Sequence, residues 1–146
     1  MIKLLGIICA IISGISMSIQ GVFNTRLGEK IGTWETNTLV QLTGLIITLI
    51  ITFFIGKGNF KALANANKLY LLGGALGVII IFTVMMSIGT LGATCGVSII
   101  LVSQLVTAAL IDYFSLFESN KVNFTLKEFI GVAIMIIGII VFKWKR

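Results

Sequence analysis

Long apolar segments separated by short polar connections dominate this sequence. A helix needs about 20 mostly apolar residues to cross the hydrocarbon core of a bilayer, which is roughly 30 Å thick. Segments that meet or approach this length lie at residues 4–27, 34–55, 69–88, 91–117 and 124–144. The sequence therefore predicts an all-α integral membrane protein with five transmembrane helices, which together form a single domain over residues 1–146.

The composition argues against a water-soluble protein. Charged residues make up 11% of the chain, against about 25% in ordinary soluble domains. The net charge is +6, but the basic residues are scattered rather than clustered on one face, so nucleic acid is not an expected partner. Cys9 and Cys95 lie inside apolar segments, and the chain has no His. No catalytic residue, metal site or cofactor is therefore expected, and the chain is not predicted to be an enzyme.

The basic residues are almost evenly divided between the two sides of the membrane. With five spans, the side of the N-terminus holds six of them: Lys3, Lys57, Lys61, Lys68, Lys121 and Lys127. The other side holds five: Arg26, Lys30, Lys143, Lys145 and Arg146. Orientation follows the Lys and Arg asymmetry of short loops. Either a weak bias fixes one orientation, or the chain inserts both ways and pairs with an inverted copy of itself.

Polar side chains form stripes inside the apolar segments. The first segment carries Ser13, Ser16, Gln20 and Asn24 at spacings of 3, 4 and 4, which place them on one helical face. The second carries Asn37, Gln41, Gly44, Thr48 and Thr52, again on one face. Lipid offers no hydrogen-bond partners, so both stripes should face protein or a water-filled cavity.

The polar stripes have two interpretations. Ser and Thr commonly join transmembrane helices by packing, whereas the larger amides suggest a shared hydrated space. In the fourth segment, Gln104 and Asp112 lie about 80° apart on a helical wheel and can border one cavity. Asp112 is either an interfacial anchor or a functional group. The candidate substrate-binding or cavity-lining residues are Ser16, Gln20, Asn24, Asn37, Gln41, Gln104 and Asp112.

Local signals predict where some helices begin and how they pack. Thr125 and Glu128 match a capping box at the start of the last segment. Thr33 is a second expected N-cap. Residues 26–32 are expected to connect the first and second segments, and residues 89–92 the third and fourth. Small residues at four-residue spacing predict close helix packing at Gly6, Ala10 and Gly14.

Short motifs in a fixed order resemble a known family. They lie at residues 18–28 (SIQGVFNTRLG), 72–77 (LGGALG), 91–93 (LGA), 103–105 (SQL), 110–114 (LIDYF), 116–117 (LF) and 127–131 (KEFIG). Together they resemble the YdcZ-type domain-of-unknown-function family of the drug/metabolite transporter superfamily, which is related to the EamA-type transporters. The resemblance extends over essentially the whole chain. Departures from the family pattern are Gln41, where an apolar residue is usual, Tyr113, where His is common, and Ser115, where Gly is common.

The resemblance implies one half of a ten-helix, inverted-repeat transporter in the bacterial cytoplasmic membrane. The family's polar positions carry over to Gln20, Asn24, Gln104 and Asp112. We therefore expect a multi-pass secondary transporter of a small molecule or metabolite, working by alternating access as an antiparallel, dual-topology homodimer. Its expected partners are membrane lipids, its inverted copy and an unidentified small-molecule substrate. Alternatives are a non-transporting scaffold or accessory subunit, or one half of a heterodimeric transporter.

Overall fold

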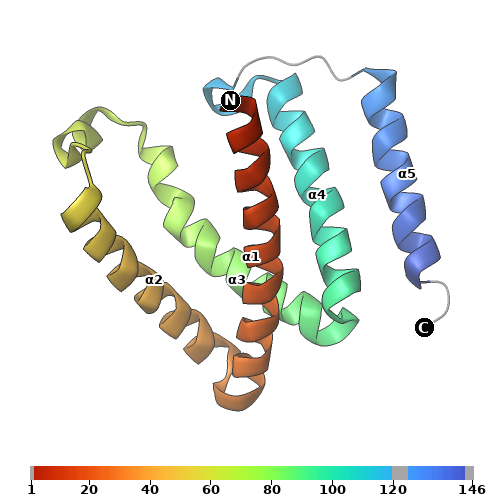
Figure 1. The fold of residues 1–146 in the computed structure, drawn as a ribbon, viewed down its shortest axis with the longest axis horizontal. Helices are drawn as coiled ribbons and strands as arrows, with labels where there is room; N and C mark the ends of the chain where they lie inside the picture. The colour runs from red at the N-terminus through yellow and green to blue at the C-terminus, as the bar shows by residue number, and fades with distance from the viewer. Residues whose placement is uncertain (1, 120–124, 144–146) are drawn as a thin grey trace. The chain divides into compact units, whose positions relative to one another are not determined.

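The computed structural model describes residues 2–119 and 125–143, and these residues form helices and connections without a strand. Figure 1 shows the α-helices, which are α1 (Ile2–Ile31), α2 (Thr33–Ile55), α3 (Gly73–Leu91), α4 (Ala93–Tyr113) and α5 (Leu126–Lys143). Short 3-10 helices lie at Phe60–Asn65, Lys68–Leu72 and Leu116–Glu118. The chain divides into two compact units, Met1–Gly89 and Thr90–Arg146, and each is described by itself.

Among the described residues, four helical segments are long and apolar enough to cross a membrane. They are Ile2–Ile31, Thr33–Ile55, Lys68–Leu91 and Ala93–Tyr113. Their side chains are mostly exposed, as large apolar side chains are when they face lipid rather than water. The structure thus confirms an all-α membrane protein. That α5 crosses the membrane as a fifth span stays a prediction, and the predicted ends of that segment at Phe124 and Trp144 lie outside the described residues.

Single glycines join α1 to α2 and α3 to α4, so two predicted connections are wrong in length. Helix α1 continues to Ile31 instead of ending at residue 27, and α3 continues to Leu91. Gly32 has φ 102° and ψ 151°, and Gly92 has φ 81° and ψ 158°. This backbone region is essentially restricted to glycine, and it turns the chain within one residue. We call Gly32 and Gly92 the elbow glycines.

The ends of other helices also differ from the sequence prediction. Helix α4 ends at Tyr113 instead of residue 117, because Ser115, Phe117 and Glu118 all have positive φ, which an α-helix excludes. The segment predicted to begin at residue 69 is a 3-10 helix until α3 starts at Gly73.

The two predicted N-caps have different outcomes. Thr33 is the first helical residue of α2 and not its cap; Gly32 takes the cap position and has no side chain to accept a hydrogen bond. At α5, the backbone N–H of Thr125 donates to Glu128 Oε2 at 2.8 Å. The Thr125 hydroxyl donates to the same carboxylate oxygen. Glu128 thus makes its half of the predicted capping box.

In the first unit, α3 packs across the end of the α1–α2 hairpin that Gly32 closes. Met85 and Ile88 of α3 are the buried apolar side chains of the described residues, at 4% and 7% exposure. A Cβ at Gly21 of α1 would lie 2.7 Å from Ile88 Cδ1, so glycine is what allows this approach. On the α2 side, the rings of Trp34 and Phe82 stack at a centroid distance of 4.6 Å. The closed end of the hairpin is therefore the packed core of this unit.

In the second unit, α4 and α5 lie side by side (Figure 1) and leave a hollow of about 620 Å³ between them. Its lining is apolar and aromatic, and it includes Tyr113, Phe114 and Phe129. None of the predicted site residues lines this hollow. It therefore has the character of a space for hydrocarbon rather than of a polar binding site.

Candidate functional site

Four polar side chains are buried at the closed end of the α1–α2 hairpin. Asn24 and Thr25 of α1 are each 7% exposed, and Thr36 and Asn37 of α2 are 0% and 2% exposed. A polar group buried without a partner destabilises the fold, and hydrocarbon outside the helices offers none. The hydrogen bonds of these four residues therefore decide whether the cluster only packs or can also bind a ligand.

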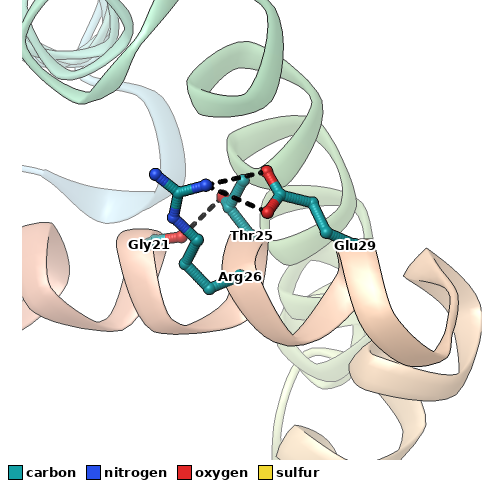
Figure 2. Close-up of polar contacts among 4 residues, drawn as sticks. All are labelled: Gly21, Thr25, Arg26 and Glu29. Carbon is teal, nitrogen blue, oxygen red and sulfur yellow. Dashed lines mark hydrogen bonds and ion pairs between the residues drawn. The ribbon is translucent and has the colours of Figure 1, made fainter.

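The two threonines are satisfied within their own helices. The Thr25 hydroxyl donates to the Gly21 carbonyl at 2.7 Å, and the Thr36 hydroxyl donates to the Gly32 carbonyl at 2.8 Å. Figure 2 shows the Thr25 bond beside the exposed Arg26–Glu29 ion pair, whose nitrogen and oxygen lie 3.0 Å apart. Such local back-bonding is the usual behaviour of a helical threonine. Thr25 and Thr36 thus fit the packing interpretation.

The same pairing of a glycine with a hydroxyl four residues later recurs in both helices. Ser18 donates to the Gly14 carbonyl at 3.0 Å, and Thr48 donates to the Gly44 carbonyl at 2.8 Å. Thr38, Thr83 and Ser98 make the same bond to the carbonyls of residues other than glycine, so the bond does not depend on the glycine. The Gly-x-x-x-Ser/Thr spacing is shared by Ser18 and Thr48, which are not buried, so no signal in the sequence singles out Thr25 and Thr36.

The buried amide of Asn37 connects α2 to α3. Its Nδ2 donates to the Val78 carbonyl of α3 at 2.8 Å. Its Oδ1 is buried and has no hydrogen-bond partner among the described residues. One turn later, the half-buried Gln41 also lies against α3, because a Cβ at Gly77 would be 3.2 Å from Gln41 Nε2. Both amides of the predicted α2 stripe therefore face α3.

The predicted site residues divide into those inside the first unit and those on its surface. Asn24, Asn37 and Gln41 belong to the packed end of the hairpin, whereas Ser16 and Gln20 are exposed on α1. Helix α3 crosses α1 near Gly21. Ser16 and Gln20 precede this crossing point, and α3 does not cover them.

The predicted residues of α4 belong to the second unit. Gln104 is exposed, and Asp112 is half-buried in the last turn of the helix. A cavity shared by the residues of both units stays a prediction. Among the residues that the structure describes, no group of three or more His, Cys, Asp or Glu side chains could hold a metal ion.

Membrane-length apolar helices with amides buried between them define a multi-pass membrane protein. The chain belongs to the family described as "Putative inner membrane exporter, YdcZ", which matches residues 5–141. It is accordingly a multi-pass protein of the inner cell membrane, in a family of transporters rather than enzymes. Comparison with curated proteins gave no match, and comparison with solved structures gave none either.

Proposed function

We propose that the protein is a secondary transporter that exports a small molecule or metabolite, and that it works as an antiparallel, dual-topology homodimer. One observation carries the proposal: Ser16, Gln20 and Gln104 are exposed within helices of membrane-spanning length. An amide that faces hydrocarbon keeps none of its hydrogen bonds to water. These side chains therefore need a hydrated surface or a protein surface against them.

A second copy of the chain, inverted in the membrane, supplies such a surface. With α5 as a fifth span, the basic residues divide six to five between the two sides, which favours insertion in both orientations. In transporters built from inverted halves, the substrate site lies between the halves. Here Gln20, Asn24, Asn37, Gln41 and Gln104 would line that site.

The transport cycle follows from this arrangement. One copy rocks against its inverted partner, so that the polar site opens first to one side of the membrane and then to the other. Asp112, at the end of α4, would recognise charge or hold a proton near the mouth of the site. The sequence contains no ATP-binding motif, so the transport is passive or coupled to an ion or proton gradient.

Labelling of one loop position in intact cells tests the dual topology. Ala62 is exposed in the long segment between α2 and α3, and its replacement leaves the balance of basic residues unchanged. In a Cys9→Ser, Cys95→Ser background, an impermeant maleimide should label Ala62→Cys in one fraction of the protein molecules in intact cells. A comparable fraction should be labelled only after the cells are lysed. Labelling wholly on one side contradicts dual topology and favours a heterodimeric half-transporter.

Oppositely biased variants test whether both orientations work together. Asn59→Lys with Ala66→Lys adds two basic residues to the side of the N-terminus, and Lys57→Gln with Lys61→Gln removes two. Each double variant alone should lack transport in proteoliposomes, and their co-expression should restore it. Activity of either variant alone contradicts the antiparallel pair.

Accessibility of the polar side chains separates a transporter from a scaffold. A water-soluble maleimide should reach cysteines placed at Gln20 and Gln104 in the reconstituted protein, because both are proposed to line a hydrated site. Cysteines at Ile11 and Leu101, which are exposed and apolar, are the matched controls that should face lipid and react slowly. Equal inaccessibility at all four positions favours the scaffold.

A further inference from the structure

The buried oxygen of Asn37 lacks a hydrogen-bond partner. The Asn37 side chain is 2% exposed, and its Nδ2 already donates to the Val78 carbonyl at 2.8 Å. Its Oδ1 has no partner among the described residues. Buried amide oxygens are nearly always hydrogen-bonded in native proteins. An oxygen of this kind between two membrane-spanning helices therefore indicates a missing donor.

The chemistry of the contact fixes which amide atom is free. Oxygen and nitrogen of an asparagine amide can be exchanged by a 180° rotation, and the hydrogen-bond network decides between the two. The Val78 carbonyl can only accept a hydrogen bond. Rotating the amide of Asn37 would bring two acceptor oxygens together at 2.8 Å. The free atom is therefore the acceptor Oδ1.

The hydroxyls of the cluster cannot satisfy this oxygen. The protons of Thr25 and Thr36 are committed to the carbonyls of Gly21 and Gly32. Asn24 and Gln41 carry amide N–H groups at the same end of the hairpin, but neither donates to Asn37 Oδ1. A donor from outside the described chain is therefore needed.

The charge of the surroundings limits the class of ligand. Asn24, Thr25, Thr36 and Asn37, the buried polar residues of the described chain, are all neutral. Glu29 and Glu35, the acids nearest to them in sequence, have exposed side chains. An ion among these helices would have no buried counter-charge, which is costly inside a membrane. The site therefore favours an uncharged ligand with at least one N–H or O–H group.

We propose that Asn37 Oδ1 binds the N–H or O–H group of an uncharged polar solute that the protein transports. The inference rests on the proposed transport function and names its substrate class. In the structure the site is closed, because the Asn37–Val78 hydrogen bond and the Trp34–Phe82 stack hold α2 against α3. Separation of these two helices opens the site to the solute.

Uptake of radiolabelled urea by proteoliposomes tests this substrate class. Urea is a minimal uncharged solute with N–H donors. Acetamide, which has donors, should compete with urea, whereas N,N-dimethylacetamide, acetate and methylammonium should not. Asn37→Leu, which keeps the size of the side chain, should lower uptake by at least about tenfold, since it removes the acceptor. Thr38→Val, at an exposed neighbour that bonds only to the Trp34 carbonyl, should leave uptake unchanged.

A second variant distinguishes binding from a structural role. Asn37→Asp keeps an acceptor oxygen, adds a negative charge and loses the donor to the Val78 carbonyl. The α2–α3 contact should therefore loosen, and the preference should shift from urea to methylammonium. Loss of all uptake in Asn37→Asp, or unchanged uptake in Asn37→Leu, overturns the inference. Competition by N,N-dimethylacetamide equal to that by acetamide also overturns it.

If the wild type carries acetate or methylammonium but not urea, the transport function stands and the substrate class is wrong. If it carries none of these solutes, the substrate class is wrong and the transport function loses support.

Discussion

Replacing Gly32 by alanine should destabilise the first unit through the backbone. The residue has φ 102° and ψ 151°, in a region essentially restricted to glycine, where another residue pays about 1–3 kcal/mol. The unfolded chain loses freedom when alanine replaces glycine, which offsets about 0.4–1 kcal/mol. We therefore expect Gly32→Ala to lower the free energy of unfolding by up to about 2.5 kcal/mol.

Contacts of the new methyl group add little to this value. A Cβ at Gly32 would collide with Glu35 Oε2, but Glu35 is exposed and its carboxylate can move away. Gly92 provides the matched comparison, since it has a similar backbone, with φ 81°, and nothing within 4 Å of its Cβ position. Gly92→Ala should therefore destabilise the protein by a similar amount.

Reversible unfolding of the full chain in mixed micelles, followed by the loss of helical signal in far-ultraviolet circular dichroism, measures these differences. Gly14→Ala is the control, because Gly14 is inside α1 with open space around it. Alanine is favoured over glycine in a helix by up to about 1 kcal/mol, so this variant should be neutral or more stable. If Gly32→Ala and Gly14→Ala have the same free energy of unfolding, the backbone explanation is refuted.

The same unfolding measurement checks two further predictions, and hydrogen exchange checks a third. Gly21→Leu should cost about 1–3 kcal/mol, because its first carbon already lies 2.7 Å from the buried Ile88 Cδ1. Trp34→Leu should cost about 0.5–1.5 kcal/mol by removing the stack on Phe82. Thr125→Ala removes the hydroxyl that bonds to the Glu128 carboxylate, and the amides in the first turn of α5 should then exchange faster.

Each of these predictions has its own control. Gly6→Leu adds the same side chain where nothing lies within 4 Å, so a loss equal to that of Gly21→Leu would contradict the packing explanation. In a double-mutant cycle, additive losses from Trp34→Leu and Phe82→Leu would show that the two rings do not interact. Unchanged exchange at the start of α5 would show that the Thr125 hydroxyl does not stabilise this end of the helix.

Hydropathy alone predicted the membrane class and the approximate places of the helices, but not how they are joined. Residues 26–31 are polar enough to suggest a loop, yet they continue α1, where Arg26 and Glu29 pair across one helical turn. At the other extreme, the apolar residues Leu116 and Phe117 extend the hydropathy pattern of α4 beyond its end. Polarity reports the depth of a residue in the membrane, and it carries no information on the sign of φ.

The predicted polar stripes are buried only where they meet a third helix. Gln20 and Asn24 are one turn apart on the same face of α1, and the sequence does not distinguish them. Asn24 is buried and Gln20 is exposed, because α3 crosses α1 only near its closed end. Tertiary contacts of this kind have no local signal. The unpaired oxygen of Asn37 likewise depends on the Val78 carbonyl, 41 residues away along the chain.

The elbow glycines also bear on how the chain enters the membrane. With the four spans in alternation, both elbows lie at one face of the bilayer, while residues 56–72 and 114–119 emerge at the other. A one-residue connection is too short for one helix to stay in water while its neighbour is already inserted in the membrane. The pair of α1 and α2 should therefore leave the translocation machinery as a closed hairpin. A protease confined to the elbow face should find almost no peptide to cut between the helices.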